Sequence, residues 1–426
     1  MVDKISDKDH FCDCPPLSVS HWNRQTGKVE RPQIAPYKIS IESLQNECHL
    51  VPADSPVCVI QARANAIRKC ERCRTSLVKA FGMPEYWWTD WCQNSNGYHS
   101  SETTRDEAGM TGFNTWVYFE TKEASESEKE YDKTISKPVA QVKYHWFKIN
   151  VFMHYIPSTK QTFIVMFDMD KAVIDRLIDL IVLLPNTSNS PSETSDRDPF
   201  WVYAKIAGEL VRLQDTAVWH IRNLVRNREK ELKETGRRPQ PNYRALHDIA
   251  RHAIHVSETL DVATETVAGL ITQHEEFRKQ QEEGGDHNNY SRIHGELLFH
   301  NSMLNSLKHR AASNKARLEN EIHLAFNDTA QYDSRIAVKI GRAAQGDSAA
   351  MKTIAFFTMA FLPATFLSAI FSMSFFNFDP DADVWRVSNK IWIYFAFAAP
   401  VTLATFLGWY FWQLIFPTVL IGEKED

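Results

Sequence analysis

The chain lacks the short motifs that carry the common enzymatic chemistries. Glycine is scarce, with 15 residues in 426. The sequence contains no glycine-rich phosphate-binding loop, no nucleophile elbow and no His-Glu-x-x-His metal motif. Its acidic residues and histidines are scattered without a catalytic spacing. These absences predict that the protein is not an enzyme and uses no cofactor.

A strong excess of charge is also missing. The net charge is −5, which gives no indication of a nucleic-acid partner. Residues 1–9 are charged and polar, whereas a secretory leader would be basic and then apolar. We therefore expect the water-soluble part of the chain to stay in the cytosol.

Cysteine is absent after Cys92, and the seven cysteines up to and including Cys92 are odd in number. In the cytosol they would be reduced. Cys70-Glu-Arg-Cys73 has the spacing of two metal ligands, and Cys92 and His99 are the nearest candidates to complete a zinc site. Cys12-Asp-Cys14 is a weaker pattern. The sequence favours ordinary reduced cysteines over a zinc site.

Long apolar runs are confined to the C-terminal part of the chain. They cover residues 354–376 and 391–416, with an acidic loop at 377–390 between them. Each run exceeds the roughly 20 residues that a helix needs to cross a bilayer. Both runs are predicted to be transmembrane helices. With 43% hydrophobic residues overall, the rest of the chain is large enough to fold around cores of its own.

Hydroxyl side chains follow a helical period along the first apolar run. Thr358, Thr365 and Ser372 recur at every seventh position, and Ser368 lies on the same helical face. This face either lines water in a pore, or its hydroxyls bond back to the preceding turn and hold helices together. Since two helices cannot enclose a pore, the first alternative requires several copies of the chain around an axis.

The same region resembles a known family. Met351-Lys-Thr-Ile354, Phe361-Leu-Pro-Ala-Thr-Phe366, Phe371-Ser-Met-Ser-Phe375, the acidic loop and the second apolar run are similar to the CorA-type divalent cation channels, in the variant found in filamentous fungi. The family's Tyr-Gly-Met-Asn motif at the outer end of the first span is replaced by Phe371, Ser372, Met373 and Ser374. The resemblance implies a homopentamer and places the selectivity filter at Ser372, Met373 and Ser374.

Other candidate cation sites come from polar residues outside the first span. The loop carries Asn377, Asp379, Asp381 and Asp383, which would attract cations to the pore mouth. A weaker candidate for a bound metal is the set Asp248, His252 and His255, which lies on one helix with nearly one-turn spacing. The alternative is that these residues form an ordinary polar helix face, which contacts solvent or a neighbouring subunit.

Patterning predicts an α+β cytosolic domain, then a very long stalk helix of coiled-coil type, and then two transmembrane helices. This is the mostly helical, funnel-like architecture that the resemblance implies. The predicted segments are an irregular Pro-rich lead at 1–60, an α/β part at 61–200 with a solvated insertion at 121–133, a helical part at 201–289, the stalk at 290–353, the first transmembrane helix at 354–376, the loop at 377–390, the second transmembrane helix at 391–416 and an acidic tail at 417–426.

The sequence thus favours an oligomeric membrane channel for divalent cations similar to Mg²⁺, gated by its cytosolic domain. The alternative is a membrane-anchored scaffold or sensor of the same fold that does not conduct. In either case the partners are the lipid bilayer and further copies of the chain. Both termini are expected in the cytosol, and the plasma membrane is the favoured location.

Overall fold

The computed structural model describes residues 12–23, 26–44, 55–106, 109–126, 130–132, 137–139, 142–183, 198–231, 241–280, 287–381 and 383–415. Within helix α8 and strand β11 the side chains of residues 371–376 are outside this description. The chain divides into two compact units, the first ending at Leu324 and the second running from Ala325 to Asp426. Each unit is described by itself.

The first unit is built on an eight-stranded sheet with the order β2-β1-β4-β10-β9-β6-β5, and β3 pairs with β1 at one side. Strands β4 and β10 are parallel, while the other neighbours are antiparallel. The strands are β1 (Leu17–Asn23), β2 (Lys28–Glu30), β3 (Gln33–Ile34), β4 (Val57–Ala62), β5 (Gly97–Asp106), β6 (Gly109–Glu126), β9 (Val142–Ile156) and β10 (Gln161–Phe167). A separate pair is formed by β7 (Glu130–Asp132) and β8 (Lys137–Val139).

Both faces of the sheet are covered, which the burial of the central strand β10 makes clear. All seven residues of β10 are buried, including the polar Gln161 and Thr162. Phe163, Val165 and Phe167 point into a core shared with the helices α1 and α2. A strand buried on both sides is expected to be continuously apolar rather than alternating. This explains why Phe-Ile-Val-Met-Phe reads as an unbroken hydrophobic run.

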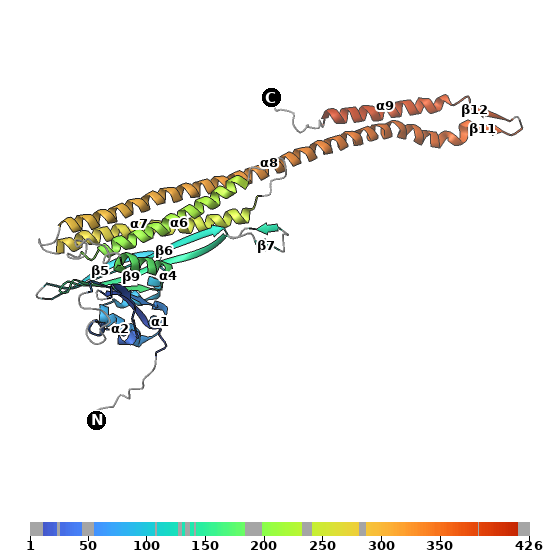
Figure 1. Ribbon diagram of the computed structural model, residues 1–426. Coiled ribbons are helices and arrows are strands. Elements are labelled where there is room, and N and C mark those ends of the chain that lie inside the picture. The colour runs from blue at the N-terminus through green and yellow to red at the C-terminus, as the bar shows by residue number, and fades with distance from the viewer. Residues whose placement is uncertain are drawn as a thin grey trace. The chain divides into compact units, whose positions relative to one another are not determined.

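Helices form a layer on each side of the sheet (Figure 1). One side carries α1 (Ala64–Arg68) and α2 (Glu71–Phe81), joined by two residues and followed by short helical turns at Glu85–Trp88 and Asp90–Gln93. The other side carries α6 (Trp201–Glu231) and α7 (Tyr243–Gln280), with α4 (Lys171–Ile178) and a π turn at Asp179–Leu183 preceding them. Helices α6 and α7 both lie within the segment at 201–289 that the sequence predicts to be helical.

The first part of helix α8 (His287–Phe375) packs against α6 and α7. Its buried residues follow the predicted seven-residue spacing through Leu297, Leu304, Ala311, Leu318 and Ala325. Arg317 makes two hydrogen bonds to Glu229 of α6, at 2.9 and 2.6 Å. Lys308 pairs with Asp261 of α7 at 3.0 Å. The apolar seam predicted for the stalk therefore begins as part of the first unit's own core.

The prediction of an irregular lead at residues 1–60 is wrong for the described part. Strands β1 to β4 lie within it, and Leu17, Val19 and Ile60 are core residues. The error has a physical cause, because these strands are short and interrupted by prolines, so no period is sustained long enough to read.

The prediction of a solvated insertion at residues 121–133 is also wrong for its described part. Strand β6 continues to Glu126, and Thr121, Lys122 and Ala124 are buried. Tertiary contacts here override the polar composition. The acidic tail predicted at 417–426 lies outside the described residues.

The second unit contains the later part of α8, a small antiparallel hairpin and a last helix. The hairpin is made of β11 (Phe376–Asp379) and β12 (Val384–Val387), and the last helix is α9 (Trp392–Ile415). The two apolar runs thus form helices, as predicted. Both are long and apolar enough to cross a membrane. The structure confirms the predicted order of an α+β domain, a very long helix and two C-terminal apolar helices.

Candidate functional site

The hydroxyls of the first apolar run bond back to their own helix. Thr358 Oγ1 donates to the carbonyl of Ile354 at 2.8 Å. Thr365 Oγ1 lies 2.9 Å from the carbonyl of Phe361 and 3.0 Å from that of Leu362. This is the back-bonding that serine and threonine commonly make in membrane helices. It occupies the hydroxyl proton and leaves the oxygen lone pairs directed away from the helix, where they can accept a bond from water or contact a cation.

Helix α9 packs on one side of α8. Phe356 of α8 contacts Phe406 and Trp409 of α9, with ring centroids 5.0 and 5.7 Å apart. Tyr394 of α9 donates its hydroxyl to the carbonyl of Ala364, the residue after Pro363, at 3.0 Å. Phe356 and Ala364 therefore mark the α9-facing side of α8.

The hydroxyls lie on the opposite side of α8. At 100° per residue, Thr365 is about 20° around the helix from Thr358, whereas Phe356 is about 160° away. Thr358, Thr365 and Ser368 are exposed in the single chain. Helix α9 therefore does not use the hydroxyl face, and packing between α8 and α9 does not account for it.

Apolar side chains share that face with the hydroxyls. Ile354 and Phe361 are exposed on the same line, with Ile354 one turn before Thr358 and Phe361 between the two threonines. The face reads Met351, Ile354, Thr358, Phe361, Thr365 and Ser368, with the alternating three- and four-residue steps of a helix seam. Of the predicted filter position at Ser372, Met373 and Ser374, Ser372 continues this spacing, four residues after Ser368. Its side chains are outside the described residues, so its assignment stays a prediction.

The acidic loop is a hairpin rather than an irregular segment. Asn377 pairs with Arg386 across β11 and β12, and Phe378 packs against Trp385 at 5.3 Å between ring centroids. Asp379 accepts the backbone N–H of Asp381 at 3.2 Å. Its other oxygen lies 3.2 Å from the guanidinium of Arg386. One of the three predicted cation-attracting aspartates, Asp379, is therefore already ion-paired, while Asp383 holds the turn with a left-handed φ of 49°.

The weaker metal candidate on α7 is arranged around a lysine. The ammonium of Lys122, from β6, lies 2.7 Å from His255 Nδ1 and over the rings of Tyr144 and Trp146 at 4.5 and 4.8 Å. His252 is buried, 3.7 Å from Asp248, which also pairs with Arg251. A fixed positive charge thus sits where a divalent cation would have to bind, and the cluster does not have the form of a metal site.

The pKa values in this cluster reflect burial and that positive charge. Desolvation, and next the charge of Lys122, lower the pKa of His252 to about 4. The same two causes lower the pKa of His255, and desolvation lowers that of Lys122. The lowered pKa values of both histidines favour their uncharged form near neutral pH.

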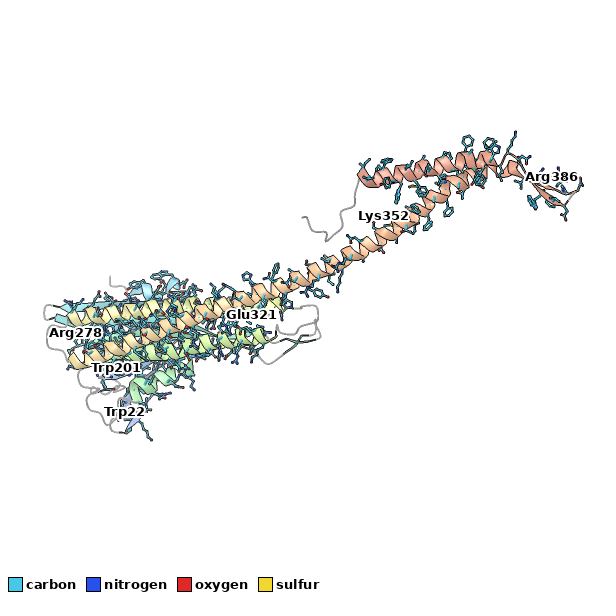
Figure 2. All side chains as sticks on the ribbon, turned by 90° about the horizontal axis from the view of Figure 1, so that it is seen from above. Trp22, Trp201, Arg278, Glu321, Lys352 and Arg386 are labelled. Atoms are coloured by element: carbon cyan, nitrogen blue, oxygen red, sulfur yellow. The ribbon has the colours of Figure 1, made fainter. Side chains whose placement is uncertain are left out.

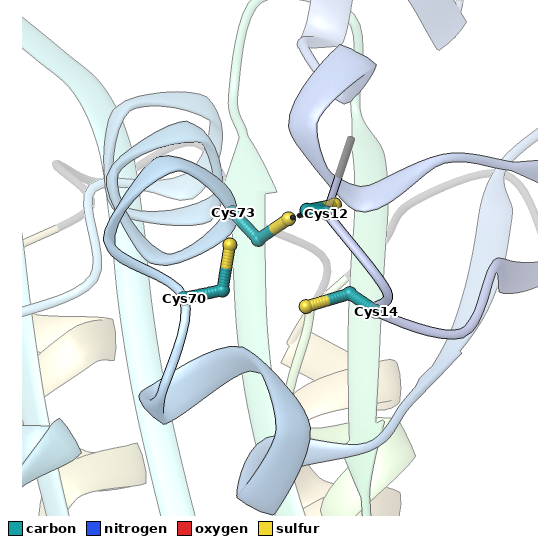
Figure 3. A group of neighbouring side chains, drawn as sticks. All are labelled: Cys12, Cys14, Cys70 and Cys73. Carbon is teal, nitrogen blue, oxygen red and sulfur yellow. Dashed lines mark hydrogen bonds between the residues drawn. The ribbon is translucent and has the colours of Figure 1, made fainter. Parts of the chain in front are cut away.

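Four cysteines meet on the other side of the sheet (Figure 3). Cys12 and Cys14 precede β1, whereas Cys70 caps the N-terminus of α2 and Cys73 lies in its first turn. Their Sγ atoms all lie within 4.8 Å of one another. Cys12 Sγ is 3.3 Å from Cys73 Sγ, and Cys14 Sγ donates to the carbonyl of Ala66 at 3.6 Å.

The cluster corrects an expectation from the sequence. Cys92 and His99, the candidates chosen to complete the Cys70 and Cys73 pair, are not among the clustered residues, and Cys92 Sγ donates to the carbonyl of Tyr86. The pair that does meet Cys70 and Cys73 is the weaker pattern, Cys12 and Cys14. The signal in the sequence was the presence of two closely spaced pairs. Nothing local indicated that the fold would join them.

The surroundings act on the four thiols in different ways. The backbone N–H of Cys73 lowers the pKa of the Cys70 thiol. Burial raises the pKa of Cys14 to about 11 and also raises that of Cys73. Cys73 is fully buried and the other three are partly buried.

Comparison with known proteins identifies similar chains, although no family model matches. A curated relative, notoamide biosynthesis cluster protein M' of Aspergillus versicolor, is 32% identical over 228 residues, which cover 48% of this chain and 47% of that protein. The match thus spans about half the length of the relative.

Among solved structures, full-length CmaX is similar with a TM-score of 0.46 and 14% identity, over 95% of this chain and 98% of that chain. The CorA magnesium transporter of Methanocaldococcus jannaschii has a TM-score of 0.38 and 12% identity, over 92% and 96%. The ZntB cytoplasmic domain of Vibrio parahaemolyticus has a TM-score of 0.36 and 9% identity, over 72% and 97%.

Proposed function

We propose that the chain is one subunit of an oligomeric membrane channel for divalent cations similar to Mg²⁺, with the cytosolic domain gating the pore. In this account α8 from about Ile354 and α9 cross the bilayer, and the β11–β12 hairpin lies on the far side. Both termini are in the cytosol, in a membrane for which the plasma membrane is favoured. The homopentameric state comes from the resemblance of the C-terminal motifs to the CorA-type channels.

The observation that carries the proposal is the position of the hydroxyl face. Thr358 and Thr365 are exposed on the side of α8 opposite to α9. In a symmetric assembly a seam of this spacing turns toward the neighbouring copies and the axis. Rings of threonine oxygens would then face the axis, with a narrower apolar ring of Phe361 between them and another of Ile354 on the cytosolic side. Apolar constrictions of this kind are used as gates in channels.

An acidic residue extends the same line toward the cytosolic side. Asp347 lies eleven residues before Thr358, which places it within about 20° of that threonine around the helix. It is exposed in the single chain. In an oligomer Asp347 would form a ring of carboxylates below the pore, where hydrated cations collect.

Exposed apolar surface in the second unit supports both the membrane and the oligomer. Figure 2 shows side chains standing out from α8 beyond Lys352 and from α9. Phe361, Phe366 and Ile370 of α8, and Leu403, Phe411 and Trp412 of α9, are among the exposed residues. An exposed apolar surface of this extent needs lipid or protein to cover it. Before the bilayer, Ile336 and Ile340 are exposed as well, so the stalk also has a face for neighbouring copies.

The test is uptake of Mg²⁺, and then of other divalent ions, into liposomes that contain the purified protein. Thr365→Leu is expected to abolish flux, because it replaces a ring of oxygens by bulkier apolar groups. Ser374→Asn is expected to change the order of ion preference, since an amide presents different geometry to a hydrated ion. Thr402→Leu on α9 is the matched control and is expected to conduct.

A non-conducting scaffold or sensor is the second candidate, and the ion pair between Asp379 and Arg386 favours it. That pair reduces the negative charge that the hairpin offers to cations. If wild-type protein forms a stable oligomer in the liposomes and passes none of the ions, the channel proposal is wrong and the scaffold is retained.

A further inference from the structure

We propose that Cys12, Cys14, Cys70 and Cys73 bind one zinc ion through four thiolates, as a structural site of the cytosolic domain. The proposal does not depend on the channel function. The ion is held within one chain and lies far in sequence from the membrane helices, so it is not the transported cation.

The geometry fits a single tetrahedral ion. With Zn–S bonds of about 2.3 Å, the edges of a thiolate tetrahedron are about 3.8 Å long. The Sγ atoms all lie within 4.8 Å of one another, and the Cys12–Cys73 separation is 3.3 Å. Separations that differ from this edge length by up to about 1 Å can be made equal by rotation of the cysteine side chains. A cluster of several iron atoms would need the thiolates to lie farther apart.

The four sulfurs converge from two elements that are themselves well fixed (Figure 3). Cys70 is the N-cap residue of α2, and its carbonyl accepts the backbone N–H of Arg74 at 3.0 Å. The other end of α2 stops at Gly82, whose left-handed φ of 63° suits glycine. Cys14 is oriented by its contact with the carbonyl of Ala66 in α1. The site is therefore built by the first turn of α2 on one side and by the segment before β1, which contacts α1, on the other.

The surroundings suit a site with net negative charge. Four thiolates and one Zn²⁺ carry a charge of −2. The N-terminus of an eleven-residue helix faces them at Cys70 and Cys73, and helix N-termini stabilise negative charge. Basic residues follow closely in the sequence, with Lys69, Arg72 and Arg74 against the single acid Glu71. This assigns a local reason for the basic composition of α2.

The site would tie the first described residues to the helical layer. Cys14 and Cys70 are separated by 55 residues that include β1 and β4, so an ion joining them closes a long loop across the sheet's edge. Closure of a long loop stabilises the folded chain by restricting the unfolded one. Loss of the ion should therefore loosen the segment before β1 before it affects the rest.

The first experiment measures metal by mass spectrometry of the full chain, purified in detergent through a tag without histidines. The wild type is expected to contain one zinc ion per chain, released on titration with a mercurial thiol reagent. Cys70→Ser/Cys73→Ser is expected to contain none. Cys92→Ser is the matched control and is expected to keep its zinc, because Cys92 lies outside the cluster.

A second measurement covers the case in which the double variant fails to fold. Wild-type protein prepared with Co²⁺ should show the thiolate charge-transfer absorption of a tetrahedral tetrathiolate site, and X-ray absorption of the zinc form should give four sulfur neighbours at about 2.3 Å. Cys12→Ser or Cys14→Ser should replace one of the four sulfurs.

Two results would overturn the proposal. One is wild-type protein that binds neither zinc nor cobalt although all four cysteines are reduced. Alkylation of the four thiols after unfolding would show that they are reduced. The other is a disulfide between two of the four cysteines in protein kept reducing throughout purification. Zinc that remains in Cys70→Ser/Cys73→Ser at the wild-type level would show an adventitious ion only.

Discussion

In the proposed channel, the charged side chains of the β11–β12 hairpin and of the residues just after it set the charge that an approaching cation meets. Asp379, Asp381 and Asp383 are opposed by Arg386 and Lys390, which leaves a net charge of −1 from three acids and two bases. Arg386 is largely exposed and pairs with Asp379. The hairpin is thus only weakly attractive to cations, although its sequence alone reads as acidic.

Removal of this basic residue should strengthen the attraction. Arg386→Ala changes the net charge of the hairpin from −1 to −2 and frees Asp379. We expect faster divalent uptake at low ionic strength, by a factor of about two to five, and a smaller difference as salt approaches 0.1 M, where the screening length is about 10 Å. Arg386→Lys keeps the charge and should behave as wild type. An Arg386→Ala protein with unchanged uptake at low salt would contradict this view.

Buried neutral histidines should make the first unit sensitive to acid. Burial lowers the pKa of His154 to about 4, and burial with the nearby Lys122 lowers that of His252 to about 4. The unfolded chain binds these protons near pH 6.5 and the folded chain only near pH 4, so stability falls as the pH drops through that window. Each histidine contributes about 1.4 kcal/mol per pH unit within it.

The contribution of His252 can be isolated by substitution. Both of its ring nitrogens are buried without a hydrogen-bond partner among the described residues. His252→Leu should therefore leave the melting temperature at pH 7.5 unchanged or higher, and should reduce its decline between pH 6.5 and 4.5. His145→Leu, at an exposed position, serves as the control. Equal pH dependence in all three proteins would count against a neutral His252.

Residue-level predictions from the sequence succeeded where the partner is close along the chain. The hydroxyl periodicity needed only one helix, and Thr358 and Thr365 lie on one face as expected. The cysteine cluster joins Cys14 to Cys70, 56 positions later in the chain, and the contacts of Lys122 join two strands and a helix. Neither arrangement leaves a local pattern, because each depends on how the sheet and its helices are assembled.

At the level of elements, the long helices were predictable and the sheet was only partly so. Helices α6 and α7 lie within the segment at 201–289 predicted to be helical, because their apolar period is sustained over many turns. Strands β1, β4 and β5 were missed, since they are short or polar. Strand β6 was cut short in the prediction at the Glu- and Lys-rich run, where Lys122 is buried against aromatic rings.

Helix α8 is buried in its first part and exposed in its later part, so mutations in the two parts should have different effects. Leu304 is fully buried against α6 and α7, whereas Ile340 is 64% exposed in the single chain. Leu304→Ala should lower the free energy of unfolding by about 2–5 kcal/mol through loss of packing and the cavity left behind. Ile340→Ala should change it little and should instead weaken the oligomer. Denaturation and light scattering of the two proteins test this, and the reverse pattern would contradict it.

At the level of the whole molecule, a folded α+β unit is followed by a second unit whose apolar side chains a single copy of the chain leaves exposed. The first unit has its own core and buries most of its apolar side chains. The second offers two apolar helices of transmembrane length with their side chains exposed. In the proposed channel, a lipid bilayer would cover the outer side of such a pair. Further copies of the chain would cover the hydroxyl side, and only an assembly of this kind would enclose a path for ions.

The most direct measurement is accessibility of a cysteine at Thr365 to a charged, water-soluble thiol reagent during cation flux. All native cysteines precede residue 93, so the parent protein provides the background. The account predicts that the reagent blocks flux through Thr365→Cys and leaves Phe366→Cys, about 100° around the helix, conducting. Reaction at Phe366→Cys with none at Thr365→Cys would place the hydroxyl face away from water and would contradict the pore.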